Sequence, residues 1–196
     1  IKGSSDLSET EPFIKGMFHV QDESSMLAVS VLNPKPGETV LDVCAAPGGK
    51  SFLAAEKMNN TGRIVSCDIH PHKIELIKST AERLGINIIE TKIRDASETH
   101  KEDFEKYDRV IVDAPCSGLG LIRKKPDIKK NKTGNDIDSL YELQKKILDA
   151  SADCVKPGGI LVYSTCTICK KENELNMKYL LGKGNFEAID IKEYLP

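Results

Sequence analysis

Short apolar runs alternate along the chain with longer segments whose apolar residues recur at helical spacing. The runs predict strands over residues 39–43, 63–68, 86–91, 107–113, 160–164 and 186–191. Strands that are apolar throughout and separated by amphipathic helices are typical of a parallel sheet covered by helices on both faces. The pattern therefore predicts an α/β fold with a doubly wound, mostly parallel sheet.

Local signals mark where several of the helices begin. Asp22 is expected to cap the first long helix, and Pro71 suits the first turn of a later one. Ser139 and Glu142 form a capping-box pattern, which predicts the start of the last long helix. Residues 114–138 before it form a polar stretch in which we expect no regular element.

The 196 residues suffice for one domain with a sizeable core. Residues 1–20 lack clear periodicity and are expected to lead into a single domain over residues 21–196. Lys-Pro-Gly-Gly at 156–159 predicts a turn before the fifth strand. The chain begins with Ile1 and stops soon after the sixth apolar run, so we expect a segment of a longer protein whose sheet can lack its final edge strand.

Composition narrows the class of protein. Hydrophobic residues make up 39% and charged residues 30%, which is an ordinary globular balance. The net charge of −2 argues against a uniformly basic nucleic-acid binder but allows a local basic face. No apolar run approaches the roughly 20 residues of a membrane helix, so we expect no membrane partner and a cytoplasmic protein with reduced thiols.

A glycine turn follows the first predicted strand, where open parallel sheets bind ligands. Gly48 and Gly49 let the backbone approach a ligand closely, and Asp68, after the second strand, can accept hydrogen bonds from a ribose. This spacing admits both NAD and S-adenosylmethionine. Pro47 removes an amide that a pyrophosphate would use, which favours a ligand without phosphates. A nicotinamide oxidoreductase remains the alternative.

The residues of this turn carry a resemblance to a known family. Asp-Val-Cys-Ala-Ala-Pro-Gly-Gly-Lys at 42–50 resembles the cofactor motif of the Sun-type RNA 5-methylcytosine methyltransferases. Phe-His-Val-Gln-Asp-Glu-Ser-Ser-Met at 18–26 resembles the family's lead-in to the domain, and the similarity continues to Glu-Asn-Glu at 172–174. The resemblance covers most of the chain and is closest to the bacterial branch that methylates small-subunit ribosomal RNA.

The resemblance implies a Rossmann-like methyltransferase domain that takes S-adenosylmethionine and releases S-adenosylhomocysteine. Asp68 would hold the ribose and Asp95 the adenine. The implied cofactor contacts are Cys44, Ala45, Ala46, Pro47, Gly48, Gly49, Lys50, Asp68, Asp95 and Asp113. The implied partner is RNA, ribosomal rather than transfer RNA. The family commonly carries an N-terminal RNA-binding region, which we expect to be absent from this segment.

Two cysteines follow neighbouring predicted strands and would face one crevice. Addition of a thiolate to carbon 6 of cytosine makes carbon 5 able to attack a methyl group. By resemblance, Cys166 is this nucleophile and Cys116 assists product release. From chemistry alone Cys116 stays a competitor, because DNA cytosine methyltransferases use a Pro-Cys motif after the fourth strand. Asp113 could bind the base, and Lys50 or a nearby basic loop could lower the thiol pKa.

The remaining cysteines suggest less chemistry. Cys67 and Cys154 are expected to be small buried hydrophobes. Cys166 and Cys169 form a Cys-x-x-Cys pair, which can signal redox or zinc chemistry, but no second pair completes a set of ligands. We therefore expect no metal.

A basic stretch lies in the polar segment after Cys116. Arg123, Lys124, Lys125 and Lys129 would attract RNA phosphates, and the Arg-x-x-Pro-Asp-Ile-Lys pattern resembles the family here. A solvated lysine-rich loop without a ligand is the alternative. For the whole chain, the alternatives are a non-catalytic module that binds RNA or cofactor, and transfer RNA as the substrate.

Overall fold

The structure is a computed structural model that describes residues 6–129 and 134–194, apart from the side chains of residues 128 and 129. Its strands are β1 (Thr39–Asp42), β2 (Arg63–Asp68), β3 (Ile89–Ile93), β4 (Tyr107–Asp113) and β5 (Val155–Ser164). Its helices are α1 (Glu11–Ile14), α2 (Glu23–Leu32), α3 (Gly49–Lys57), α4 (Pro71–Arg83), α5 (Gly134–Ala152) and α6 (Glu174–Leu181). Short 3-10 helices η1 (Leu7–Glu9), η2 (Lys101–Asp103), η3 (Leu119–Leu121), η4 (Pro126–Lys129) and η5 (Lys192–Tyr194) complete the described elements.

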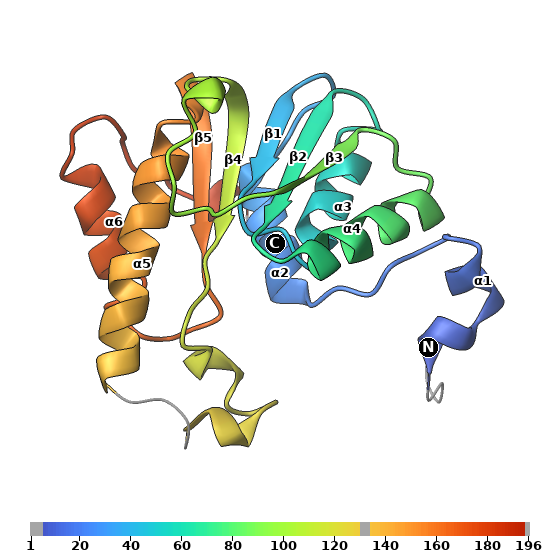
Figure 1. The fold of residues 1–196 in the computed structure, drawn as a ribbon, viewed down its shortest axis with the longest axis horizontal. Helices are drawn as coiled ribbons and strands as arrows, with labels where there is room; N and C mark the ends of the chain where they lie inside the picture. The colour runs from blue at the N-terminus through green and yellow to red at the C-terminus, as the bar shows by residue number, and fades with distance from the viewer. Residues whose placement is uncertain (1–5, 130–133, 195–196) are drawn as a thin grey trace.

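The strands form one parallel sheet in the order β3-β2-β1-β4-β5 (Figure 1). The chain moves outward from β1 to β3 and then returns to β4 on the other side of β1. This reversal makes the sheet doubly wound and places a switch point between β1 and β4. The predicted fold class is confirmed.

Helices cover both faces of the sheet, as the apolar strands require. Val29 and Leu32 of α2 and Ala55 of α3 pack on one face, and α4 lies beside α3 through Phe52. On the other face Ile147 of α5 packs on the core cluster, and α6 lies beside α5 (Figure 1). Burial on both faces stabilises the sheet by roughly 25 cal/mol for each Å² of apolar surface removed from water.

Two predicted helix starts are confirmed. The Asp22 side chain accepts a hydrogen bond from the Ser24 backbone N–H (3.1 Å) and so caps α2. Pro71 lies in the first turn of α4, where its missing N–H leaves no helical hydrogen bond unmade.

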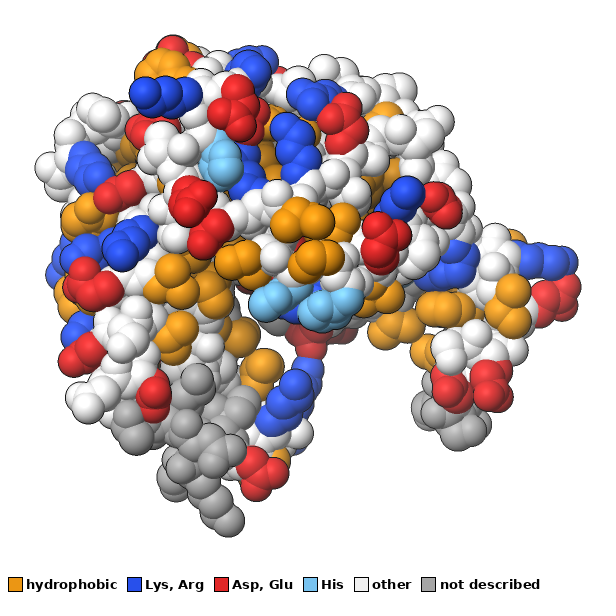
Figure 2. Space-filling view, in the orientation of Figure 1, with side chains coloured by type: hydrophobic (Ala, Val, Ile, Leu, Met, Phe, Trp, Pro, Cys, Tyr) orange, Lys and Arg blue, Asp and Glu red, His pale blue; other side chains and the backbone are white. Residues whose placement is uncertain are grey.

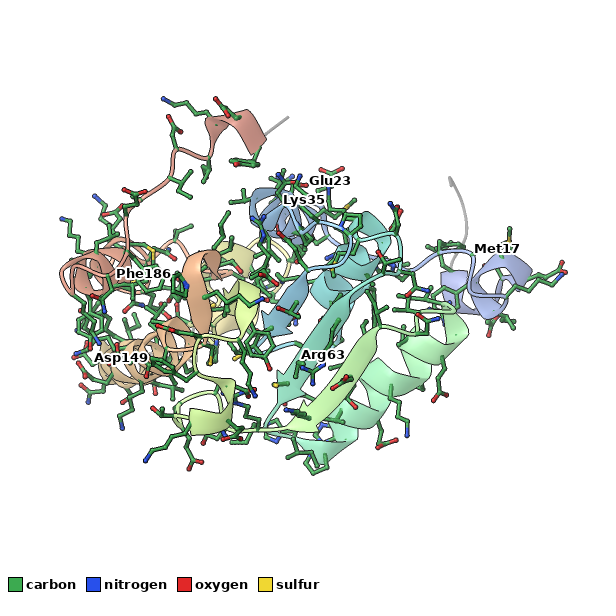
Figure 3. The ribbon with its side chains drawn as sticks, turned by 90° about the horizontal axis from the view of Figure 1, so that it is seen from above. Met17, Glu23, Lys35, Arg63, Asp149 and Phe186 are labelled. Atoms are coloured by element: carbon green, nitrogen blue, oxygen red, sulfur yellow. The ribbon has the colours of Figure 1, made fainter. Side chains whose placement is uncertain are left out.

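The predicted sixth strand is wrong. Residues 186–191 form no strand, although Phe186 packs against the core beside β5 (Figure 3). Ile189 and Ile191 are exposed, and the chain then crosses to η5, which lies beside α2. The alternating apolar residues therefore line a groove of about 550 Å³ along β5 instead of pairing with that strand.

The start of α5 also differs from the prediction. The helix is described from Gly134, so Ser139 lies inside it and donates to the Asn135 carbonyl (2.9 Å) instead of capping an end. In addition, residues 114–138 contain η3 and η4, and residues 1–20 contain η1 and α1.

Two strand boundaries move for local reasons. The third strand begins at Ile89 rather than 86, because the Ile86 N–H donates to the Ala81 carbonyl (2.9 Å) and finishes the end of α4. The predicted turn at 156–159 is an irregularity inside β5. There the register against β4 passes from Val155 directly to Ile160.

Candidate functional site

Carboxylates gather at one edge of the sheet. Asp42, Asp68 and Asp113 end β1, β2 and β4, and Asp95 lies just after β3. Since the strands are parallel and adjacent, their carboxyl ends meet at the same edge. The predicted cofactor residues are therefore brought to the switch point of the sheet.

The turn after β1 has a shape that requires glycine. The Ala45 N–H donates to the Cys67 carbonyl (2.7 Å), and the Gly48 N–H donates to the Ala45 carbonyl (2.7 Å). Gly48 has φ +105°, and a Cβ there would lie 2.3 Å from the ring of Phe52. Among the residues that the structure describes, no side chain caps the N-terminus of α3, which begins at Gly49. The first-turn amides of α3 thus lie beside the carboxylate edge without a side-chain acceptor.

Asp42 is buried beneath this turn. One oxygen accepts from the Ser51 hydroxyl (2.8 Å), and Oδ1 has no hydrogen-bond partner among the described residues. Burial raises the pKa of this carboxyl to about 7. An unpartnered acceptor at the ligand-binding edge is a group that a bound cation or donor would satisfy.

The two carboxylates farther along the edge are held by local contacts. Asp68 accepts from the His70 N–H (2.9 Å) and lies 3.5 Å from the Lys73 ammonium. Asp95 accepts from the backbone N–H and the hydroxyl of Ser97, and these bonds lower its pKa. Both side chains are therefore oriented before any ligand binds.

These groups fit S-adenosylmethionine better than NAD. The sulfonium and ammonium of S-adenosylmethionine are positive, whereas the pyrophosphate of NAD is negative. The carboxylates of Asp68 and Asp95 attract the first and repel the second, whereas Asp42 is buried with a raised pKa and Asp113 is paired with Lys50. The residues present therefore match the cofactor that the sequence motif implies.

Asp113 connects the cofactor turn to the end of β5. Its Oδ2 lies 2.6 Å from the Lys50 ammonium, which also donates to the Ser25 hydroxyl (3.3 Å). Its Oδ1 accepts from the Ser164 hydroxyl (2.8 Å). Lys50 is thus paired with Asp113 in the structure.

The structure brings the two predicted cysteines together. Cys116 Sγ lies 3.1 Å from Cys166 Sγ, and the Cys166 N–H donates to Cys116 Sγ (3.2 Å). The thiol hydrogen bond from Cys116 lowers the pKa of Cys166 to about 7 and raises that of Cys116. Burial and the negative charge of Asp113 oppose the lowering. Cys166, which is also the exposed member of the pair, is therefore the thiol that ionises first.

The loop after β4 is closely fitted to the Cys166 segment. The Gly120 N–H donates to the Cys166 carbonyl (3.0 Å), and a Cβ at Gly120 would lie 2.8 Å from that oxygen. The close approach of the two backbones requires glycine at this position.

The predicted RNA-binding side chains differ in their surroundings. Arg123, Lys124 and Lys125 are exposed, and Lys124 forms an ion pair with Asp22 at the N-terminus of α2. The Lys129 side chain lies outside what the structure describes. Figure 2 shows basic and acidic side chains interspersed over the body, with a hollow beside the projecting loop. Positive charge is therefore a local property of the loop.

Burial raises the pKa of three of the other thiols, those of Cys44, Cys67 and Cys154. The pKa of Cys67 rises to about 12. Cys154 is 1% exposed and donates to the Ala150 carbonyl. The backbone N–H of Cys169 donates to the Thr167 hydroxyl. Within residues 6–129 and 134–194, no cluster of metal-ligating side chains is present.

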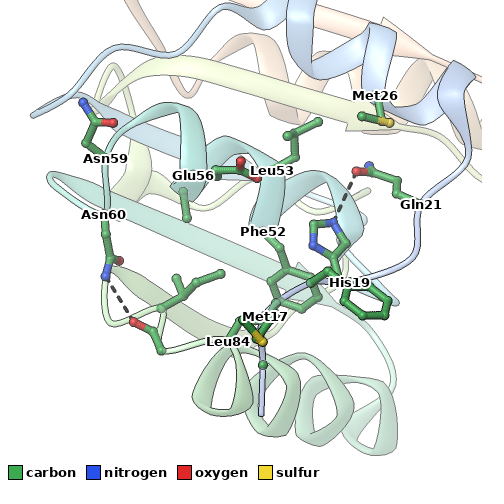
Figure 4. Close-up of a pocket in the computed structure, with 15 residues that line it drawn as sticks. Met17, His19, Gln21, Met26, Phe52, Leu53, Glu56, Asn59, Asn60 and Leu84 are labelled. Carbon is green, nitrogen blue, oxygen red and sulfur yellow. Dashed lines mark hydrogen bonds between the residues drawn. The ribbon is translucent and has the colours of Figure 1, made fainter. Parts of the chain in front are cut away.

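A cavity of about 570 Å³ lies between α3, the end of α4 and residues 16–21 (Figure 4). Its polar wall includes His19 and Gln21, whose Nε2 and Oε1 are 3.4 Å apart, and Asn60, which donates to the Gly85 carbonyl. None of the predicted site residues whose side chains the structure describes lines it. Met17 lies in the leading segment beyond α4, across the sheet from Phe186 (Figure 3).

Sequence reasoning missed a buried polar cluster behind the cysteines. Its members are Ser117, Gln144, Thr167, Glu172 and Asn176, each at most 8% exposed. The available signal was Gln144, a polar residue on the apolar face of α5 beside Leu143 and Ile147.

No helix in the described part of the chain is both long and apolar enough to cross a bilayer.

Comparison with known proteins agrees with this geometry. Residues 29–194 match the sequence profile of a family described as 16S rRNA methyltransferase RsmB/F. A probable ribosomal RNA small subunit methyltransferase B of Bacillus subtilis is 50% identical over 100% of this chain and 44% of its own length. The human tRNA (cytosine(72)-C(5))-methyltransferase NSUN6 is 38% identical over 90% of this chain and 39% of its own length.

One solved structure is similar to this chain in both fold and sequence. NSun6 from Pyrococcus horikoshii, solved with the S-adenosylmethionine analogue SFG, has a TM-score of 0.85 and 33% identity. The match covers 91% of this chain and 46% of that one. The chain therefore spans less than half the length of each of these relatives.

Proposed function

Because the chain belongs to the RsmB/F family of 16S rRNA methyltransferases, we propose that it carries the catalytic domain of an enzyme that methylates carbon 5 of cytosine in RNA. The observation that carries the proposal is the pair of thiols 3.1 Å apart at the ends of β4 and β5. The pair lies at the same sheet edge as the acidic cofactor residues. Residues 21–196 form this domain in the proposal.

Cys166 is the nucleophile in this scheme. Its pKa of about 7 gives a substantial thiolate fraction at neutral pH. Addition of the thiolate to carbon 6 of cytosine removes the aromaticity of the ring and makes carbon 5 nucleophilic. After carbon 5 is methylated, it loses its proton and the Cys166–carbon bond breaks. Covalent catalysis thus divides one difficult step into easier ones.

S-adenosylmethionine, when bound, supplies the methyl group. The glycine turn at 44–50 and the carboxylates of Asp68, Asp95 and Asp113 would hold it, with Asp68 at the ribose and Asp95 at the adenine. These roles are supported by the position of the groups on one sheet edge and by the fit of acidic side chains to a cationic ligand.

Three further groups act around the base. Cys116, within hydrogen-bond reach of Cys166, stabilises the thiolate and assists its release from the product. Asp113 accepts a hydrogen bond from the base and so favours the adduct. Lys50, paired with Asp113, holds that carboxylate in place.

The proposed substrate is small-subunit ribosomal RNA. The relative with 50% identity is named as a ribosomal RNA methyltransferase, whereas the 38% identical human relative is named for transfer RNA. Arg123, Lys125 and Lys129 would contact RNA phosphates, and Lys124 would do so after leaving Asp22.

Transfer of labelled methyl groups tests the proposal. The chain, incubated with labelled S-adenosylmethionine and undermethylated ribosomal RNA, is expected to label cytosine at carbon 5. Cys166→Ser should abolish labelling, while the matched control Cys169→Ser should retain it. Transfer that survives in Cys166→Ser would refute the nucleophile, and cofactor binding without any transfer would favour a non-catalytic module.

A further inference from the structure

A buried carboxylate lies behind the two cysteines. Glu172 and Gln144 are fully buried, and Ser117 is 2% exposed. Burying a carboxylate is costly unless hydrogen bonds compensate for the lost water. The contacts of Glu172 therefore carry information about what holds this part of the site together.

Among the described residues, every hydrogen-bond partner of the Glu172 carboxylate is a donor. Oε1 accepts from the Ser117 backbone N–H (2.8 Å) and from Gln144 Nε2 (3.0 Å), and Oε2 accepts from the Ser117 hydroxyl. An ionised carboxylate only accepts hydrogen bonds, so it matches all three partners. Because the Ser117 hydroxyl donates to Glu172, the Thr167 hydroxyl must donate to Ser117 across their 2.8 Å contact.

The hydroxyls in this chain of hydrogen bonds belong to the residues that directly follow the two cysteines in sequence. Ser117 directly follows Cys116, and Thr167 directly follows Cys166. The two hydroxyls and the two thiols are thus parallel cross-links between the same two segments. Glu172 is the acceptor that fixes the direction and position of the hydroxyl cross-link.

Glu172 is itself anchored to the scaffold. Its backbone carbonyl accepts from the Tyr163 hydroxyl (2.7 Å) near the end of β5. Gln144 of α5, which donates to its carboxylate, also donates to the Pro115 carbonyl (2.9 Å) just before Cys116. Residues of β5 and of α5 therefore both support the position of this carboxylate.

We propose that Glu172 is a positioning residue that, through Ser117, holds the Cys116 thiol within hydrogen-bond distance of Cys166. Its catalytic consequence rests on the function proposed above, since it acts on that reaction through the cysteines. Without Glu172 the loop after β4 keeps its sequence but loses the contacts that set its distance from the Cys166 segment.

Glu172→Leu is the informative substitution. The side chain keeps roughly its size, but no acceptor oxygen remains for the Ser117 N–H, the Ser117 hydroxyl and the Gln144 amide. The loop must shift to bring these donors to other acceptors, which moves Cys116 away from Cys166. Ser117→Ala removes the hydroxyl cross-link while leaving the Glu172 charge and the backbone N–H contact in place, and it keeps the proposal testable if Glu172→Leu folds poorly.

Asp108→Asn serves as the matched control. Asp108 lies at the start of β4, at the opposite end of the strand from Asp113. It accepts from the Thr39 N–H (2.8 Å) and pairs with Lys156 (2.8 Å). The variant removes one partly buried carboxylate charge without touching the cysteine loops.

The readout is the pH midpoint of Cys166 alkylation, which requires neither RNA nor cofactor. The groups that face Cys166 are Cys116, Asp113 and Glu172. Loss of the Cys116 contact raises the midpoint, whereas mere loss of the Glu172 charge lowers it, so the two effects have opposite signs. We expect Glu172→Leu to raise the midpoint by about one pH unit, Ser117→Ala to raise it by less, and Asp108→Asn to leave it unchanged.

Two results would overturn the proposal. A midpoint below that of the parent in Glu172→Leu would mean that Glu172 acts only through its charge. A midpoint unchanged in both variants would mean that the carboxylate only supports folding. Where methyl transfer is measurable, kcat should fall about tenfold in Glu172→Leu with little change in KM for RNA. Failure of methyl transfer in the parent would refute the proposed function. The alkylation midpoints would still test whether Glu172 positions Cys116.

Discussion

Removing the Cys116 thiol should raise the pKa of Cys166. The hydrogen bond from Cys116 is the largest cause that holds the Cys166 pKa at about 7, against an ordinary value of 9.0. Burial and the charge of Asp113 act in the opposite direction. Cys116→Ala leaves these opposing influences in place, so the Cys166 pKa should move to about 9 or above.

The expected size of the effect decides which observable to use. At pH 7.5, a thiol of pKa 7 is about three-quarters ionised and a thiol of pKa 9 about 3% ionised, a fall of about 25-fold. A thiolate of higher pKa is also more nucleophilic, by roughly eightfold over two units. The net rate at one pH therefore falls only about threefold, and the midpoint of the pH profile is the sharper measure.

Alkylation with iodoacetamide across a pH series provides the assay. Mass spectrometry of the modified peptides separates Cys166 from the other cysteines. The midpoint should lie near 7 in the parent chain and in the control Cys169→Ala, which removes a thiol from the same segment. A Cys116→Ala midpoint equal to that of the parent would refute the claim that Cys116 sets the reactivity of Cys166.

Three further predictions address the cofactor edge and the basic loop. Asp42 keeps its proton to about pH 7 when folded and loses it near pH 3.8 when unfolded, so its contribution to stability is lost as pH rises between these values. Relative to the parent, the free energy of unfolding of Asp42→Asn should therefore rise by up to about 4 kcal/mol as the pH increases from 4 to 8. Chemical unfolding measures this, and a difference that does not depend on pH would contradict it. Gly48→Ala should abolish cofactor binding by calorimetry, because its φ of +105° and the adjacent ring exclude a Cβ; unchanged affinity would show that the turn can adapt. Arg123→Ala and Lys125→Ala should each reduce the slope of log K for RNA binding against log salt concentration by about one. Lys124→Ala should have a smaller effect, because Lys124 is paired with Asp22. Equal effects for all three variants would show that the pairing with Asp22 does not weaken the contact of Lys124 with RNA.

The parts of the fold that sequence predicted well are those set by local pattern. The second and fourth strands begin and end where their apolar runs do, and Asp68 and Asp113 end them as expected. Once strands are parallel, their carboxyl ends must meet, which is why aspartates far apart in sequence were assigned to one edge. The proximity of Cys116 and Cys166 followed from the same rule.

The parts that failed depend on tertiary partners. The run at 186–191 has strand-like alternation but makes no ladder with β5, and Ser139 matches a capping box although α5 begins before it. The pairing of Ser117 with Glu172 joins segments distant in sequence through a buried network, and no local pattern specifies it. No local pattern specifies the ion pair of Lys124 with Asp22 either, because these residues are also distant in sequence.

Trapping of a protein–RNA adduct tests the central claim most directly. The Cys116→Ala variant is mixed with S-adenosylmethionine and undermethylated ribosomal RNA, then denatured. If Cys166 attacks carbon 6 and Cys116 assists release, a denaturation-resistant adduct should accumulate and should vanish when Cys166→Ala is added. An adduct that persists without Cys166, or no adduct while the parent chain transfers methyl groups to the same RNA, would contradict the account.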